Sequence, residues 1–327
     1  MIQQPLRISL AAAIAAVFSH GALAQTPPAW PTKPIRMIVP FSAGGANDLM
    51  ARAAAEGASK ALGQPVVVEN KPGAGTTIAG DFIVKSAPDG YTLWLQDITT
   101  HAINPALYTK LPYDSMKDFS FVAMVASTPL MLVVHPTTQA QNVKELLGLL
   151  KANPGKYSYG SSGNGTIVHL AAEMLRSAAG VEVLHVPYKG SNPATAAILG
   201  GEVTFVFSTM PPAVSNARAG KLRALAVTTP KRVGAAPEVP TMIESGLKDF
   251  DVVLYSGVLG PKGMDPAVVK KLNAAFAATV RAPEIQKVYE QIGADAIVMT
   301  PEEFLKKTEA EIAKLAPMVK ASGAKVD

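Results

Sequence analysis

The sequence predicts an α/β protein with two lobes, and three observations support this fold class. Short apolar segments alternate with amphipathic segments of helical period, which is typical of parallel sheets covered by helices on both faces. Glycine-rich turns join several of the strands to the helices that follow them. The chain has 327 residues, of which 48% are hydrophobic and 17% charged, so it has enough apolar material for packed cores.

The first strand–turn–helix unit sets the pattern for the rest. Residues 35–39 form a short apolar run that ends at Pro40, and helix-forming residues begin at Asn47. Either Asn47 or Asp48 is expected to cap the new helix. A helix start of this kind attracts anions, because unpaired N–H groups and the positive end of the helix dipole point to one place. An ordinary turn explains this unit equally well, but the chain repeats the unit at residues 159–166, which favours a binding role.

The other elements follow in order along the chain. Further strands are predicted at residues 66–69, 91–96, 119–125, 130–134, 157–160, 181–186, 203–207, 222–227, 252–259 and 296–299. Helices are predicted at residues 47–62, 142–152, 166–178, 192–199, 212–219 and 265–280, with others ending near Ser86, lying between 280 and 296, and beginning at Thr300. Gly63 is a stop signal, whereas Asp265 and the capping-box spacing of Thr300 and Glu303 are start signals. The last helix is predicted to dock through an apolar face formed by Phe304, Ile312, Leu315 and Met318.

Two α/β lobes account for this order of elements. The outer lobe is expected to combine residues 30–128 with residues 258–327, and the inner lobe to be formed by residues 129–252. The chain would then cross between the lobes twice, near Thr128 and near Val253.

The first 24 residues are expected to be a cleaved export signal that is not part of the fold. Arg7 precedes an apolar run over residues 8–18, and Ala22-Leu-Ala24 has the small residues of a cleavage site. A retained N-terminal anchor is the alternative. No later stretch approaches twenty uncharged apolar residues, so we expect a soluble mature protein. The absence of cysteine excludes disulfides, thiol nucleophiles and cysteine-ligated metals.

Several kinds of chemistry are disfavoured. The formal charge is +5, the basic residues are scattered and aromatic residues make up 6%, so nucleic acid is not an expected partner. Neither Gly73-Ala-Gly75 nor Gly163-Asn-Gly165 continues as GxGxxG, and no phosphate-loop, GxSxG or HExxH motif occurs. We therefore expect no cofactor, no metal site and no enzyme activity. The enzymatic alternative is an exported hydrolase or lyase that uses Ser162 with His169 or His185, although His169 is expected to be packed inside a helix.

Loops that follow strands are the expected binding region, because ligands of open α/β sheets lie beyond the carboxyl ends of the strands. The first loop (residues 41–48) and the second loop (residues 161–166) come from different predicted lobes. Both offer uncharged donors, which suit a carboxylate without leaving a buried positive charge. The expected ligand-binding residues of these loops are Phe41, Ser42, Ala43, Gly44, Asn47, Asp48, Ser161, Ser162, Asn164 and Thr166. Thr99, Thr100 and Ser208 also follow strands, and Thr99 and Ser208 are expected to be ligand-binding residues that line the same cleft. A role of all three as ordinary turn residues is equally consistent.

Seven segments give the chain a resemblance to a known family. They are Pro34–Asp48, Leu62–Gly75, Ala87–Thr92, Tyr159–Thr166, Val186–Gly190, Gly220–Val227 and Val239–Gly246. Together they resemble the tripartite tricarboxylate transporter substrate-binding proteins, also called Bug receptors, over essentially the whole mature chain. The resemblance implies a type II periplasmic-binding-protein fold, whose two lobes close on a small organic carboxylate in the cleft between them. It also implies a periplasmic receptor, expected as a monomer, that delivers the ligand to membrane permease subunits.

In such receptors the turns that match the first and second loops bind the carboxylate, largely through backbone groups and ordered water. The ligand is expected to shift the population toward the closed form, because only closure brings both loops to it. A receptor that feeds a sensor kinase is the alternative to one that serves a permease.

Three positions depart from the pattern of this family. Ser208 stands where aspartate is usual, Tyr255 where tryptophan is usual, and Leu315 where tryptophan is common. Ser208 and Tyr255 are expected to shape the distal end of the binding pocket. The serine would remove a negative charge, and this is expected to admit a second carboxylate.

Overall fold

The computed structural model of the chain describes residues 30–248, 250–322 and 325, so the predicted export signal lies outside the described residues. The strands are β1 (Ile35–Val39), β2 (Val66–Asn70), β3 (Thr92–Asp97), β4 (Phe119–Val134), β5 (Ser158–Ser161), β6 (Leu184–Pro187), β7 (Phe205–Thr209), β8 (Arg223–Val227), β9 (Val253–Pro261) and β10 (Asp295–Ala296). The helices are α1 (Ala46–Leu62), α2 (Thr77–Val84), α3 (Ile98–Leu107), α4 (Val143–Ala152), α5 (Ile167–Ala179), α6 (Ser191–Leu199), α7 (Met210–Arg218), α8 (Pro266–Arg281), α9 (Pro283–Gln291) and α10 (Pro301–Ser322), and the short 3-10 helix η1 (Ala74–Thr76) precedes α2.

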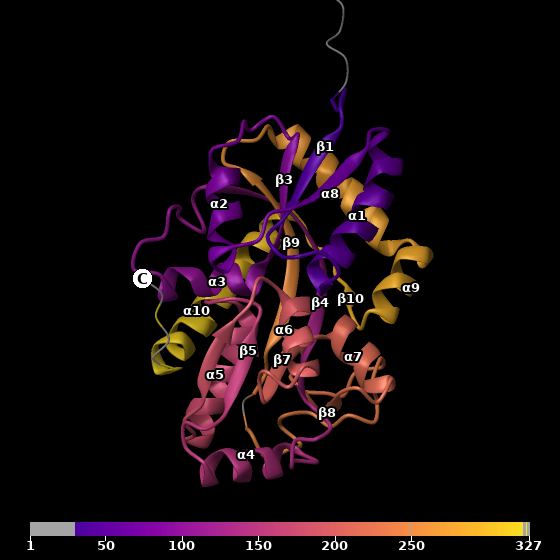
Figure 1. Cartoon of the computed structure of the whole chain (residues 1–327). Coiled ribbons are helices and arrows are strands. Elements are labelled where there is room, and N and C mark those ends of the chain that lie inside the picture. The colour runs from indigo at the N-terminus through magenta and orange to yellow at the C-terminus, as the bar shows by residue number, and fades with distance from the viewer. Residues whose placement is uncertain (1–29, 249, 323–324, 326–327) are drawn as a thin grey trace, which may run out of the picture.

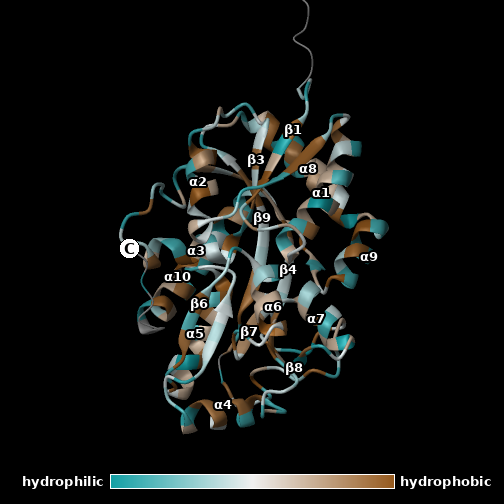
Figure 2. Ribbon diagram, viewed as in Figure 1, coloured by the Kyte–Doolittle hydropathy of each residue, from teal (hydrophilic) through white to brown (hydrophobic). Residues whose placement is uncertain are grey.

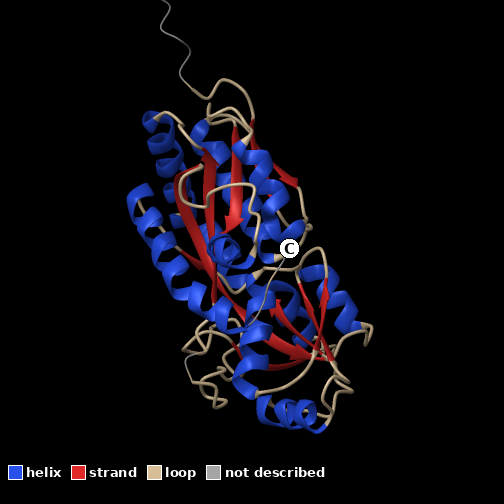
Figure 3. Cartoon of the chain, turned by 90° about the vertical axis from the view of Figure 1, so that its left-hand side faces the viewer, coloured by secondary structure: helices blue, strands red, loops and turns tan. Residues whose placement is uncertain are grey.

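Strand β4 is shared by two groups of strands, and these groups form the two lobes (Figure 1). In one group β2, β1 and β3 are parallel, and β9 pairs antiparallel with both β3 and the first part of β4. In the other group the second part of β4 pairs antiparallel with β7 and β8, while β5 lies parallel between β6 and β7. Figure 3 shows helices covering both groups of strands. The predicted two-lobed α/β fold is confirmed.

Strand β4 is continuous over 16 residues, whereas the sequence predicted two strands at residues 119–125 and 130–134. The prediction is wrong because Pro129 does not interrupt the ladder. Pro129 is the last residue that pairs with β9, opposite Val253, and Leu130 is the first that pairs with β7, opposite Thr209. A proline lacks an N–H donor, so it is tolerated where the strand changes partner.

Helix α3 directly follows β3 and was not predicted. Its first turn contains Ile98, Thr99 and Thr100, which are weak helix formers, and Pro105 lies near its end. The helix forms because the side chain of Asp97 accepts hydrogen bonds from the N–H groups of Thr99 and Thr100. The sequence predicted a loop at these threonines.

The start and stop signals of other helices are confirmed. Gly63 ends α1 in the left-handed conformation, with φ of 70°. Asp265 accepts a hydrogen bond from the Ala267 N–H (2.8 Å) at the start of α8. Thr300 and Glu303 make both hydrogen bonds of a capping box, at 2.8 and 3.2 Å.

Helix α10 packs against α3 and α5, and thereby touches both lobes. Phe304 and Leu315 of the predicted face are buried, whereas Ile312 and Met318 are half-buried. The rest of the buried face consists of Thr308, Glu311 and Val319. Figure 2 shows hydrophobic and hydrophilic residues alternating along α8 and α9. Within the described part of the chain, no helix has the length and apolar character needed to cross a bilayer.

Substitution by alanine should have opposite effects on stability at two helical glycines, one in the contact between α1 and α8 and the other on the open surface of α4. A Cβ atom at Gly57 of α1 would lie 2.3 Å from Cγ2 of Thr279, whereas a Cβ at Gly148 of α4 would have nothing within 4 Å. We expect Gly148→Ala to stabilise the protein by about 0.5–1 kcal/mol through helix propensity. Gly57→Ala should destabilise it by about 1–3 kcal/mol, because overpacking outweighs that gain. Urea unfolding measures both effects, and stabilisation by Gly57→Ala would contradict the tight contact.

Candidate functional site

The first loop connects β1 to α1 and is held in shape by Asp48, which is 2% exposed. The carboxylate accepts hydrogen bonds from the N–H of Gly44 (2.9 Å), the guanidinium of Arg52 (3.0 Å) and the amide of Asn70 (2.8 Å). Asn70 also donates to the Phe41 carbonyl (2.9 Å), so one carboxylate organises both ends of the loop. Burial alone would raise the pKa of Asp48, but the hydrogen bonds from Arg52, Gly44 and Asn70 outweigh burial and hold this pKa below its usual value.

The start of α1 carries amide donors that no side chain caps. Gly45 occupies the cap position without a side-chain hydrogen bond. The predicted capping by Asn47 or Asp48 is wrong, because both residues lie inside the helix. Asn47 instead accepts a hydrogen bond from Ser256 of β9 (2.6 Å) through its Oδ1 atom, which leaves its NH₂ group available as a donor. This helix start therefore suits a negatively charged group.

The second loop connects β5 to α5, and internal hydrogen bonds hold several of its groups. Thr166 caps α5, accepts a hydrogen bond from Ser162 Oγ (3.0 Å) and donates to the carbonyl of Gly163 (2.9 Å). The N–H of Gly163 donates to Ser161 Oγ (3.1 Å), and the N–H of Gly165 donates to a histidine. The N–H of Thr166 donates to the Gly163 carbonyl as well (3.3 Å), so at least three amides of this loop are engaged within the protein. This limits which of its donors remain for a ligand.

Two stacked histidines contact the second loop and help to hold its shape. The imidazole rings of His169 and His185 lie 4.1 Å apart between centroids and are nearly parallel. Nδ1 of His169 accepts the hydrogen bond of Gly165 N–H (3.2 Å), and Nε2 of His185 lies 2.6 Å from Ser161 Oγ. Burial lowers the pKa of both residues, that of His185 to about 3 with a further contribution from the neighbouring His169. Both rings are therefore neutral, as the contact of Gly165 N–H with Nδ1 of His169 requires.

The two loops meet at one closed cleft. The space inside it is about 10 Å³, roughly the room that one water molecule needs. The residues that line it come from both lobes and are Phe41, Gly45, Ala46, Asn47, Asp97, Ser162, Ile167, Val168, Ser191, Thr209 and Leu254. Two hydrogen bonds cross the cleft, from Asn192 Nδ2 to the Ala43 carbonyl (3.0 Å) and from Ile167 N–H to Thr100 Oγ1 (3.1 Å).

A wider groove of about 210 Å³ adjoins this cleft. Phe41 and Ser162 line both spaces. Asn164 and Thr166 of the second loop line only the groove, opposite the glycine-rich turn at residues 72–76. The structure thus brings most residues of the two predicted loops to one region.

Three other predicted residues have side chains that do not line the closed cleft. The hydroxyl of Thr99 donates to the Val253 carbonyl (2.8 Å) and accepts from the Tyr255 N–H (3.2 Å). Ser208 is fully buried, and its hydroxyl lies 3.0 Å from that of Thr195 in α6. The ring of Tyr255 is covered by the ammonium group of Lys307, 4.3 Å from its centroid. Neither Ser208 nor Tyr255 lines the closed cleft, so no direct contact supports the role expected for them at the distal end of the pocket.

Residues next to Ser208 and Tyr255 in the sequence line the cleft instead. Thr209 follows Ser208, and Leu254 precedes Tyr255. Successive side chains of a strand point to opposite faces, so a shift of one position exchanges a lining residue for a buried one. Asp97 was also missed, although an acid at the end of a strand and before two threonines is a recognisable helix-cap signal.

The hydrolase alternative lacks its nucleophile and base. Ser162 Oγ donates to Thr166 and contacts neither histidine, while the serine that does lie beside His185 is Ser161, which is fully buried. His169 is packed, as expected, at 8% exposure. In the described ranges, no group of three or more histidine, cysteine or acidic side chains is arranged to hold a metal ion.

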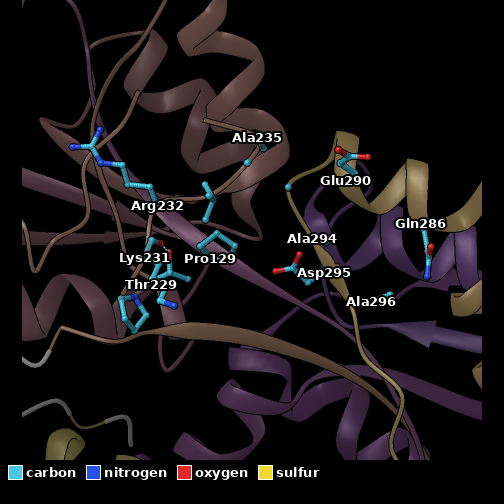
Figure 4. Close-up of a pocket in the computed structure, with 14 residues that line it drawn as sticks. Pro129, Thr229, Lys231, Arg232, Ala235, Gln286, Glu290, Ala294, Asp295 and Ala296 are labelled. Atoms are coloured by element: carbon cyan, nitrogen blue, oxygen red, sulfur yellow. Dashed lines mark hydrogen bonds between the residues drawn. The ribbon is translucent and has the colours of Figure 1, made fainter. Parts of the chain in front are cut away.

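A larger groove of about 850 Å³ lies elsewhere, between the segment after β8 and the segment from α9 to β10 (Figure 4). Lys231 and Arg232 come from one wall, and Glu290 and Asp295 come from the other. None of the predicted binding residues lines this groove. It is therefore separate from the candidate site.

Comparison with known proteins identifies the family. The profile of the tripartite tricarboxylate transporter family receptor matches residues 50–324. The protein BugT of Bordetella pertussis is 36% identical over 298 residues, which cover 91% of this chain and 91% of BugT. The solved structure of the periplasmic binding protein BugD is 35% identical, with a TM-score of 0.85 over 90% of this chain and 99% of that chain. R. palustris Rpa4515, solved with adipate, is 32% identical, with a TM-score of 0.88 over 91% of this chain and 100% of that chain. This chain therefore belongs to the tripartite tricarboxylate transporter receptor family, whose members are solute-binding receptors and not enzymes.

Proposed function

We propose that this receptor captures a small organic carboxylate in the periplasm, between the first and second loops, and delivers it as a monomer to the permease subunits of a tripartite transporter. The observation that supports this most directly is that both loops line one closed cleft. The adipate bound to Rpa4515 and the periplasmic relative BugD support the ligand class and the compartment.

The chemistry of the cleft suits an anion that is bound without a protein cation. No lysine, arginine or histidine is among its lining residues, while the start of α1, the NH₂ group of Asn47 and the hydroxyl of Ser162 provide donors. Each hydrogen bond to a charged group contributes roughly 1.5–3 kcal/mol, so several oriented donors suffice for tight binding. We propose direct contacts from Phe41, Ser42, Ala43, Asn47, Ser162 and Asn164. We propose supporting roles for Gly44, Asp48, Ser161, Thr166, Thr99, Ser208 and Tyr255, because the donors of Gly44 and Thr166 are engaged within the loops.

Ligand entry requires the lobes to separate, because a space of about 10 Å³ cannot hold an organic acid. We propose lobes of residues 30–128 plus 258–327 and of residues 129–252, which rotate about the crossings near Thr128 and Val253. The pairing of β4 with β9 continues through Thr128 and Pro129, so the two crossing strands support each other there. The ligand then favours the closed form, which alone brings both loops to it.

Glycines lie where the lobes touch in the closed form. A Cβ at Gly44 would lie 2.4 Å from Nδ2 of Asn192, and a Cβ at Gly190 would lie 2.3 Å from Oγ of Ser42. Closure therefore depends on positions that have no side chain.

A ligand screen tests the proposed function. We expect at least one small carboxylate from a panel of mono-, di- and aromatic acids to raise the melting temperature of the mature chain. At a ligand concentration of 100 times Kd the stabilisation is about 2.7 kcal/mol, which corresponds to a shift on the order of 5 °C. Mass spectrometry should recover the ligand unchanged. A panel that leaves the melting temperature unaltered, or an acid that is converted, would contradict the proposal.

Loss of the Asp48 charge should weaken binding without removing a direct ligand contact. We expect Asp48→Asn to reduce affinity at least tenfold, because the donors from Gly44, Arg52 and Asn70 lose their shared carboxylate. It should also cost about 1–3 kcal/mol of stability at pH 7. Because the folded pKa of Asp48 is lowered, this difference should begin to shrink as the pH falls below about 4 and should vanish only below the lowered pKa of the folded state. Calorimetry and urea unfolding measure the two effects. Glu56→Gln, on the exposed face of α1, is the control and should change neither.

A matched pair of glycine substitutions tests closure. Gly44 and Gly263 have nearly the same φ, 83° and 84°, but of the two only a Cβ at Gly44 would have an atom within 4 Å. Gly44→Ala should displace Asn192 from the Ala43 carbonyl and reduce ligand affinity at least tenfold. Gly263→Ala likewise places a side chain at a positive φ and should leave affinity unchanged. Calorimetry with the acid found in the screen measures both affinities. Equal affinities of the two variants would refute a closure contact at Gly44.

A further inference from the structure

We propose that the natural ligand carries a cationic ammonium group as well as its carboxylate, and that Asp97, which lines the closed cleft, receives this group. The ligand would thus be an amino acid or a close analogue of one. The inference rests on the proposed function and narrows the class of acid that the site accepts.

Asp97 lies where the two halves of the site meet. It ends β3, caps α3 and lines the closed cleft together with Asn47 of α1 and Ser162 of the second loop. Its side chain is 1% exposed. The carboxylate accepts hydrogen bonds from the Thr99 N–H (3.0 Å), the Thr100 N–H (3.1 Å) and the Thr100 hydroxyl.

Asp97 differs from the other buried acids because it has no basic partner. Four acidic side chains are buried in the part of the chain that the structure describes, namely Asp48, Asp97, Glu173 and Glu311. Asp48 pairs with Arg52 at 3.0 Å, Glu173 with Arg176 at 2.7 Å and Glu311 with Lys307 at 2.7 Å. Asp97 alone forms no ion pair within the described residues, and no basic residue lines the cleft.

An unpaired buried carboxylate is energetically costly. The donors from α3 offset part of the cost, but burial outweighs them and raises the pKa of Asp97 to about 6. At neutral pH the group is still largely ionised. A dicarboxylate in this cleft would place further negative charge beside it, whereas an ammonium group would supply the missing partner.

Capping of α3 is a sufficient reason for a polar residue at this position, but not for a charged one. Asparagine and serine cap helices about as well as aspartate. Asp97→Asn and Asp97→Ser should therefore keep α3 in place while removing the charge. The two neutral variants separate helix capping from the effect of the charge, and either variant suffices if the other folds poorly.

The test uses pairs of acids that differ only by an amino group. The pairs are succinate with aspartate, adipate with 2-aminoadipate, and 3-phenylpropionate with phenylalanine. Isothermal titration calorimetry on the mature chain should show that, in any pair that binds, the amino acid binds at least tenfold more tightly than the plain acid. In both Asp97 variants this preference should fall at least tenfold, with the melting temperature of the free protein nearly unchanged. The Glu56→Gln variant should keep the preference of the wild type.

Two results would overturn the inference while leaving the proposed function intact. One is that the wild type prefers the plain acid of a pair. The other is that the preference for the amino acid survives in both neutral variants, because the ammonium group would then be bound elsewhere. If none of the six acids binds, the inference fails, and the wider ligand screen then decides the proposed function.

Discussion

The antiparallel pairing of β4 with β9 is the constraint on which the rest of the structure depends. Its register extends to the pair Pro129–Val253, where β4 leaves one lobe for the other. The same register fixes the neighbouring strands, since β9 also pairs with the end of β3 and β4 pairs directly with β7. As a result Asp97, Thr209 and Leu254, which are far apart in the sequence, line one cleft. A shift of this register by one residue would point these side chains away from it.

Most of the fold could be predicted from the sequence, because hydrophobic period and turn residues report local structure directly. The failures have identifiable causes. Strand β4 continues through Pro129 because its partner changes at that residue, which only the tertiary pairing determines. Helix α3 has a weak intrinsic propensity and depends on the cap from Asp97 and on packing against α10. Both cases are decided by contacts that a local pattern does not contain.

The candidate site was predictable as a pair of loops, but not side chain by side chain. The anion-binding character of a helix start depends on the backbone, so the sequence located the two loops and the structure brings them together. The face on which a strand residue lies depends on register, and for this reason Ser208 and Tyr255 were chosen while Thr209 and Leu254 line the cleft. Nor could the sequence indicate that Gly165 donates its N–H to an imidazole instead of to a ligand.

The stacked imidazoles of His169 and His185 have a consequence for how the receptor responds to acid. Their pKa values are lowered by burial, so on acidification the unfolded chain takes up protons that the folded chain does not. These two histidines thus disfavour the folded state progressively as the pH falls below about 6.5, while inside the folded protein both rings keep their neutral form to a lower pH than an exposed imidazole would. Through these rings, acidification therefore lowers the stability of the receptor before it disturbs the hydrogen bond from Gly165 that shapes the second loop.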